Sequence, residues 1–140
     1  MGGKNISKNS KLKAGIITAV IVCMMGIPTF AAANVVVSLS ANQVWTSGYA
    51  QSRSGNYTSG YASCSSVYPL SGSDNFKKMQ FRLTSSSGTQ ISLNASYVLE
   101  EGGGYSGAGI KSEYAGLQTI YFQFRGNSHE AANAVVNYFY

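Results

Sequence analysis

Apolar and polar residues alternate one by one over several short stretches, and this pattern constrains the fold more than any other feature of the chain. Between residues 77 and 83, Met79, Phe81 and Leu83 alternate with Lys78, Gln80 and Arg82, and the same period recurs over 91–99 and 119–124. Successive side chains of a strand point to opposite faces, so each stretch has one apolar face and one polar face. No window sustains helical spacing. The pattern predicts antiparallel sheets with one solvated side.

The alternation and the turn residues predict a small antiparallel β-sandwich of about seven strands, with a closed barrel as the alternative. The expected strands are 35–39, 43–50, 57–67, 77–83, 91–99, 119–124 and 132–140. The turn at 85–88 joins 77–83 to 91–99 in one hairpin. The turn at 54–56 is expected to join 43–50 to 57–67 in a second hairpin.

One glycine-rich segment, residues 100–109, interrupts the alternation with the sequence EEGGGYSGAG. Glycine loses more backbone freedom on folding than any other residue, so this composition predicts a mobile loop and not a strand. Its function is either that of a lid or binding loop, or that of a plain connection across the sandwich.

Residues 1–33 have the composition of a secretory signal peptide. Four lysines (Lys4, Lys8, Lys11 and Lys13) precede the apolar stretch 16–30, and three alanines follow it. The stretch is shorter than the ~20 residues that span a bilayer, which disfavours the alternative of a retained membrane anchor. Cleavage is expected before Asn34. The product, residues 34–140, is then a single β-sandwich domain, secreted to the extracellular space without a transmembrane segment, and a Gram-positive source is expected.

Removal of the leader changes the charge argument. The whole chain has a formal net charge of +5, but four of its ten basic residues lie in the leader. The remainder has six basic residues and five acidic ones, so no nucleic-acid partner is expected. Only Cys64 remains of the two cysteines. We interpret it as a small buried hydrophobe in a monomer, and the alternative is a Cys64-linked dimer.

The residues suited to catalysis are few, and we expect neither an enzyme nor a cofactor. His129 is the only histidine, and Glu100 and Glu101 are sequence neighbours, which on a strand do not face one another across a cleft. One histidine and one cysteine far apart do not form a metal site. The alternative that stays open is a small secreted hydrolase built on these three residues.

The aromatic residues of the segment 43–62 form the candidate binding site. Trp45, Ser47 and Tyr49 are expected to share one strand face, as are Tyr57, Ser59 and Tyr61 on the next strand. Tyrosine has an apolar ring and a polar tip, so such a face suits sugars or lipid headgroups. Cross-strand pairing that only stabilises a hairpin is the alternative. The proposed ligand-binding residues are Trp45, Gly48, Tyr49, Tyr57, Gly60 and Tyr61, with no catalytic and no metal-binding residue.

The same segment resembles the start of the mature lactococcin 972 bacteriocins. The resemblance rests on Trp45-x-x-Gly48-Tyr49, on Asn56-Tyr57-x-x-Gly60, and on the aromatic end at residues 137–140. It implies a secreted β-sandwich that acts outside the target cell, binds the cell-wall precursor lipid II and blocks septum formation. A cell-wall or glycan-binding module without killing activity is the alternative.

Overall fold

The computed structural model describes residues 31–53, 55–70 and 76–140, and these form two four-stranded antiparallel sheets packed face to face. The strands are β1 (Ala32–Leu39), β2 (Tyr49–Ser52), β3 (Ser59–Pro69), β4 (Lys78–Thr84), β5 (Tyr97–Glu100), β6 (Ser106–Gly109), β7 (Thr119–Gly126) and β8 (Ala132–Phe139), with short 3₁₀ turns η1 (Ala41–Gln43) and η2 (Ser112–Tyr114). The expected β-sandwich is therefore confirmed, with eight strands in the described residues where about seven were predicted.

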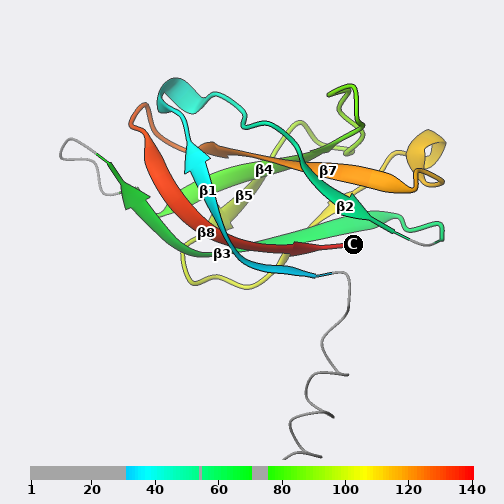
Figure 1. Ribbon diagram of the computed structural model, residues 1–140, viewed down its shortest axis with the longest axis horizontal. Helices are drawn as coiled ribbons and strands as arrows, with labels where there is room; N and C mark the ends of the chain where they lie inside the picture. The colour runs from blue at the N-terminus through cyan, green and yellow to red at the C-terminus, as the bar shows by residue number, and fades with distance from the viewer. Residues whose placement is uncertain (1–30, 54, 71–75) are drawn as a thin grey trace, which may run out of the picture.

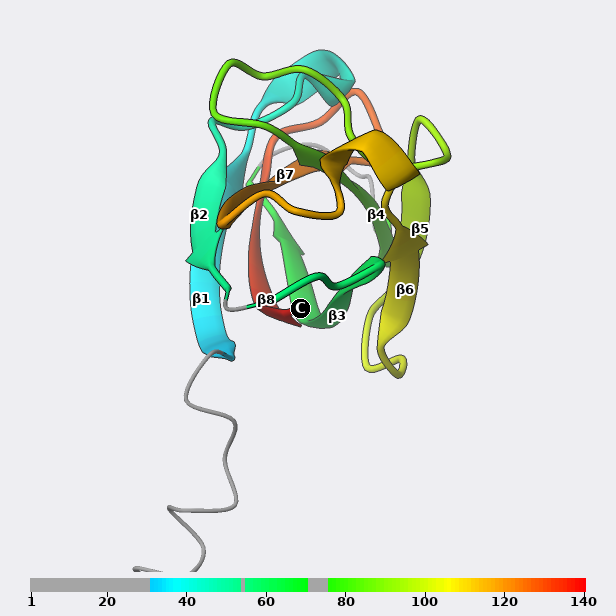
Figure 2. The ribbon, with the colours of Figure 1, turned by 90° about the vertical axis from the view of Figure 1, so that its right-hand side faces the viewer.

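One sheet has the order β1-β8-β3-β6 and the other the order β2-β7-β4-β5. Figure 1 shows them as two layers, with β8 and β3 in one and β4 and β7 in the other. In the end view of Figure 2, β1 and β2 lie on one side of the molecule, and β5 and β6 lie on the other. The two separate ladders distinguish this sandwich from the closed barrel.

The core lies between the sheets and combines large residues from one with small residues from the other. Phe81, Phe122 and Phe124 of the second sheet are fully buried. They face a layer of small side chains on the first sheet, where Ala62 and Ala134 have no exposed surface. Such complementary packing fills the space between the layers with few voids.

The first expected hairpin is confirmed at its turn, where Thr84 bridges Gln90 and the N–H of Ile91 donates to Leu83 O (2.9 Å), and again at its far end. β4 pairs with β5, with Phe81 opposite Tyr97, and Gly88 takes a positive φ of 82° in the turn. Between these two ends the chain leaves the ladder: the N–H of Leu93 donates to Gly109 O (2.8 Å) and that of Lys111 to Ile91 O (2.9 Å). This segment therefore joins the edges of the two sheets and does not extend β5.

The second expected hairpin is wrong. β2 pairs with β7, whereas β3 pairs with β8 and β6, so the two strands belong to different sheets. Residues 44–48 precede β2 without forming a strand. Arg53, which is 4% exposed, fixes the crossing by donating hydrogen bonds to the carbonyl oxygens of four residues. These are Tyr57, Tyr114, Ala115 and Leu117. Ser54 of the expected turn lies outside the described residues.

The glycine-rich segment contains a strand, which corrects the prediction of a loop throughout. β6 pairs with β3 as the edge of the first sheet, with Gly107 opposite Tyr61. A Cβ atom at Gly107 would lie 3.0 Å from the Tyr61 ring, and one at Gly109 would lie 2.7 Å from Leu93 Cδ1. The glycines are therefore present because neighbouring side chains cover the strand closely.

Most of the expected leader, residues 1–30, lies outside the described residues, so the signal peptide stays a prediction. β1 begins at Ala32, and its register with β8 shifts between Ala32 and Val35. The expected cleavage point before Asn34 falls at this irregularity, and Val35–Leu39 pair regularly with β8 beyond it. In the described part of the chain, no helix is long and apolar enough to cross a membrane.

Candidate functional site

The six predicted binding residues do not form one surface. Trp45 and Gly48 lie over the outer face of β2-β7-β4-β5, whereas Tyr61 lies on the outer face of the opposite sheet. Tyr49 is half-buried, and its ring lies 5.8 Å from that of Phe124 and 6.3 Å from that of Tyr138. The prediction that Trp45, Ser47 and Tyr49 share a face is therefore wrong, because the segment before β2 is not a strand.

Gly60 faces the core, and Tyr57 packs against another aromatic ring of the fold. Gly60 is buried, and a Cβ atom there would lie 2.9 Å from Leu83 Cδ1 and 3.1 Å from Phe122 Cζ, so it faces the core. The exposed Tyr57 precedes β3, with its ring 4.9 Å from that of Tyr140. Whether any of the six residues binds a ligand stays a prediction.

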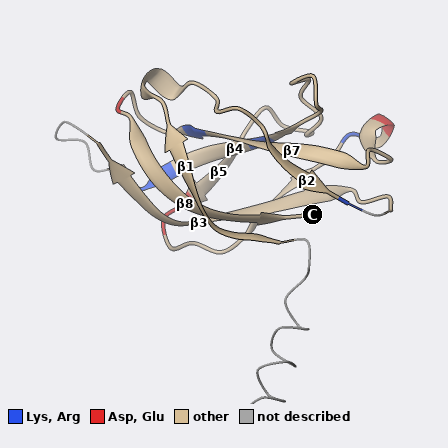
Figure 3. Ribbon diagram, viewed as in Figure 1, with Lys and Arg blue, Asp and Glu red and all other residues tan. Residues whose placement is uncertain are grey.

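The first candidate surface is the outer face of β1-β8-β3-β6, which we call the uncharged face. None of its four strands contains an acidic or basic residue, and Figure 3 shows β1, β8 and β3 without charge colours. The outward residues, given by the register, are Val36, Ser38, Tyr61, Ser63, Tyr68, Gly107, Asn133, Val135, Asn137 and Phe139. Val36 and Tyr68 are 64% and 59% exposed. Exposed apolar side chains on a sheet without charges make this face a candidate binding surface.

An aromatic cluster occupies one end of the uncharged face. Tyr61 and Phe139 are stacked, with ring centroids 5.0 Å apart and planes 18° apart. Tyr105 adds an edge-on contact to Phe139 at 4.9 Å, and it is 55% exposed. The tyrosines present apolar ring surface together with a hydroxyl group to solvent.

Amide and hydroxyl groups lie in the rows beside this cluster. Asn137 Nδ2 donates to Ser63 Oγ (3.3 Å) and Ser65 Oγ (3.1 Å), and its Oδ1 accepts from the N–H of Asn34 (2.8 Å). Ser38 Oγ donates to Asn133 Oδ1 (3.2 Å). These bonds fix the orientation of both asparagine side chains. The hydroxyl of the exposed Ser65 retains further donor and acceptor capacity, whereas Ser63 is 7% exposed.

The second candidate surface lies on the outer face of the other sheet, around the only tryptophan. The guanidinium carbons of Arg82 (β4) and Arg125 (β7) each lie 4.5 Å from the centroid of the Trp45 ring. Arg82 Nε donates to Gln123 Oε1 (2.8 Å), and Arg125 Nε donates to Gln80 Oε1 (2.7 Å). We call these five residues the arginine–tryptophan cluster.

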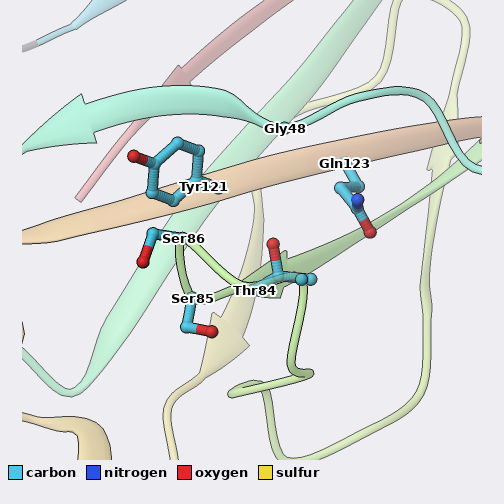
Figure 4. A pocket seen from close by; sticks show the side chains of 7 residues that line it. Gly48, Thr84, Ser85, Ser86, Tyr121 and Gln123 are labelled. Carbon is cyan, nitrogen blue, oxygen red and sulfur yellow. The ribbon is translucent and has the colours of Figure 1, made fainter.

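A shallow pocket of about 140 Å³ adjoins this cluster. Its lining residues are Gly48, Thr84, Ser85, Ser86, Gly88, Tyr121 and Gln123, none of which is charged. Figure 4 shows Tyr121 and Gln123 on one strand and Thr84 on its neighbour, with Gly48 on the segment that passes beside them. Gln123 belongs to both the pocket and the cluster, so the two features are continuous.

The residues weighed for hydrolysis have other partners. Glu101 accepts hydrogen bonds from the N–H of Val67 and from Lys77 Nζ, both at 2.8 Å, and the bond from Lys77 is the main cause that lowers the pKa of its carboxyl. Glu100 forms an ion pair with Lys78 (3.1 Å), and His129 is exposed in a bend. A carboxyl with a lowered pKa is a poor general acid. Among the described residues, no three potential metal ligands form a group.

Cys64 is 1% exposed on the inner face of β3. Burial raises the pKa of its thiol to about 11, and the nearby carboxylate of Glu101 adds to this effect. A thiol in this environment is a poor nucleophile, because the thiolate is the reactive form. The position is the one expected of a small buried hydrophobe.

Sequence reasoning missed several residues of both surfaces, including Arg82, Arg125, Asn137 and Phe139. Alternation assigned the polar positions of β4 and β7 to an outer face, but it did not show that Arg82 lies diagonally opposite Arg125. That placement follows from the register, in which Gln80 pairs with Arg125 and Arg82 with Gln123. The signal that could have found the uncharged face is the absence of charge from the expected strands 35–39, 57–67 and 132–140.

The comparisons with known proteins add no family to this description. No family model matches the chain, and no curated protein matches it. The fold and the two surfaces define a small all-β sandwich protein.

Proposed function

We propose that the protein is secreted, non-enzymatic, and binds a neutral glycan of the bacterial cell envelope through the uncharged face. The observation that carries the proposal is the stacked pair of Tyr61 and Phe139, beside the hydrogen-bonded group of Asn137, Ser63 and Ser65, on four strands without any charge.

The chemistry of this face suits a sugar better than an ion or a peptide. A sugar ring has an apolar face of C–H groups, which packs on an aromatic ring, and hydroxyl groups around its edge. Side-chain amides and serine hydroxyls both donate and accept, so they can bond those hydroxyl groups. An uncharged ligand also avoids the free energy of leaving a charge unpaired at the interface.

A bacteriocin of the lactococcin 972 type is a sharper form of this proposal. It is favoured by one observation: the two segments that carry the resemblance pack on one another. Tyr57 contacts Tyr140, and Tyr61 stacks on Phe139, with ring centroids 4.9 and 5.0 Å apart. On this proposal the envelope ligand is the lipid-linked wall precursor, and binding inhibits growth.

The test is co-sedimentation of residues 34–140 with purified peptidoglycan from which phosphate-containing polymers have been removed. The double variant Tyr61→Ala/Phe139→Ala should lose at least about tenfold in affinity, since stacked aromatic contacts at a binding surface contribute on the order of 1.4 kcal/mol or more. The control is Val98→Ala, an exposed residue on the outer face of the opposite sheet that lies outside the pocket and the arginine–tryptophan cluster. Thermal melts must show both proteins folded.

Equal retention of the double variant and the wild type would overturn the glycan proposal. Counting viable Gram-positive cells after exposure separates the two forms of it. Binding with loss of viability supports the bacteriocin, whereas binding without killing supports a wall-associated module.

A further inference from the structure

The arginine–tryptophan cluster concentrates positive charge, and no acidic residue of the described part of the chain forms an ion pair with it. Both arginine side chains are half-buried on neighbouring strands. Their guanidinium carbons lie within 4.5 Å of one ring centroid, so they are at most twice that distance apart. The ion pairs among the described residues are Lys77–Glu101 and Lys78–Glu100, and neither includes Arg82 or Arg125.

The hydrogen bonds of the cluster fix each guanidinium but leave its outer donors available. Only the Nε atoms donate within the described structure, to Gln123 Oε1 and Gln80 Oε1. Gln80 is itself held, because its Nε2 donates to Asn127 Oδ1 (3.0 Å). No Nη atom of Arg82 or Arg125 has a hydrogen-bond acceptor among the described residues. Two oriented guanidinium groups with free Nη–H donors match the oxygens of a phosphate group.

The electrostatics agree with this geometry. Partial burial, and next the charge of Arg125, lower the pKa of the Arg82 guanidinium. The two cations therefore repel one another in the free protein. An anion between them would relieve the repulsion, and the face of Trp45 already contributes a weaker attraction to both.

The adjoining pocket indicates what else the ligand contains. Thr84 follows Arg82 by two residues on β4, so both lie on the same side of the strand. The pocket offers the hydroxyl-bearing residues Ser85, Ser86 and Tyr121 and the amide of Gln123, without any charge, and the buried Thr84 lies beneath them. Its volume of about 140 Å³ suits a small polyol or a single sugar.

We propose that this face binds a phosphate ester of a polyol or sugar. The phosphate group lies against Arg82 and Arg125, and the hydroxyl-bearing part occupies the pocket at Gln123 and Tyr121. The site lies on the side of the molecule opposite to the uncharged face, so it is a second binding site and does not depend on the proposed glycan site.

Trp45 reports on the site directly, because it is the only tryptophan of the chain. The experiment titrates residues 34–140 with glycerol 3-phosphate, inorganic phosphate, glycerol and sulfate at constant ionic strength, and follows Trp45 emission. Vesicles containing phosphatidylglycerol form a further arm. Equilibrium dialysis with labelled glycerol 3-phosphate measures binding independently of the fluorophore.

The expected result is a saturable change with glycerol 3-phosphate, at least about fivefold tighter than with inorganic phosphate, and no change with glycerol. Arg82→Gln and Arg125→Gln should each weaken binding at least about tenfold, because each removes one phosphate contact. The control Lys77→Gln removes the same charge from a residue paired with Glu101, and should stay within about twofold. If a glutamine variant fails to fold, Arg82→Lys keeps the charge without the fork and should still weaken binding.

The other outcomes also decide the proposal. A response to vesicles alone that both glutamine variants lose supports the site and assigns the phosphate to a lipid headgroup. Equal responses to sulfate, phosphate and glycerol 3-phosphate show unspecific anion attraction and overturn it, as does tight binding retained in both variants. The double variant Tyr61→Ala/Phe139→Ala should leave the titration unchanged, so this proposal and the glycan proposal fail separately.

Discussion

Replacing Arg53 with methionine should destabilise the protein far more than replacing any other arginine of the domain. Arg53 is buried with no carboxylate partner among the described residues. Its charge is held by the carbonyl oxygens of Tyr57, Tyr114, Ala115 and Leu117, and burial lowers the pKa of its guanidinium. The side chain thus ties the crossing between β2 and β3 to the turn η2. Methionine keeps much of the apolar stem but none of the donors.

The magnitude follows from these four bonds. A hydrogen bond to a charged group contributes about 1.5–3 kcal/mol, so the low end for four bonds is about 6 kcal/mol. The acceptor residues lie near the surface, and water can replace part of this loss. We expect a loss of about 3–5 kcal/mol, out of the ~5–15 kcal/mol typical of a domain. The melting temperature should fall by about 15 °C or more.

Guanidinium chloride unfolding, followed by circular dichroism, measures this loss. The matched control is Arg125→Met, which removes one Nε bond and a cation–π contact from a half-buried residue and should lose about 1 kcal/mol. Arg53→Lys should fall between the two, because lysine keeps the charge but not the planar fork. If Arg53→Met unfolds within about 1 kcal/mol of the control, water satisfies the four carbonyls and the argument fails.

Two further predictions concern the core. Gly60→Ala should lose about 1–3 kcal/mol in a thermal melt, because its Cβ would lie 2.9 Å from Leu83 Cδ1, whereas Gly104→Ala, with nothing within 4 Å, should change stability little. Burial raises the pKa of Cys64 to about 11, above its value in the unfolded chain. The neutral buried thiol therefore contributes fully to the free energy of unfolding below about pH 8.5, and this contribution is lost as the pH rises towards 11. Urea unfolding of the wild type should therefore weaken more steeply over that range than that of Cys64→Ala, and parallel curves would contradict the burial argument.

Within β4 the alternation in the sequence predicts the buried face correctly, but it predicts neither the strand partners nor the face on which Trp45 lies. Met79, Phe81 and Leu83 are all fully buried, as the period of two requires. The same pattern does not say which strand lies alongside, and the turn composition between the segments around Arg53 predicts a hairpin that the structure does not contain. A buried arginine with four backbone acceptors is a tertiary feature, since three of those acceptors lie about sixty residues further along the chain.

The glycine-rich segment likewise shows that local composition does not decide secondary structure by itself. Five glycines in ten residues predict a loop when only backbone entropy is considered. At Gly107 and Gly109 that entropic cost is outweighed, because Tyr61 and Leu93 pack where a side chain would lie. Likewise, Trp45 is conspicuous in the sequence as the only tryptophan, but its neighbours Arg82 and Arg125 come from strands that only the register places beside it.

Charge is divided between the two outer faces, and this division has a consequence for binding. The sheet β1-β8-β3-β6 contains no charged residue, whereas Arg82 and Arg125 lie on the outer face of β4 and β7. Because the core separates the faces, ligands on them cannot compete sterically. If both proposed sites bind, a surface that bears neutral glycan and phosphate groups engages them together, and the second contact gains from a high effective concentration. A variant that lacks one site should therefore be retained on such a surface much more weakly than the wild type, although its affinity for the isolated ligand of the remaining site is unchanged.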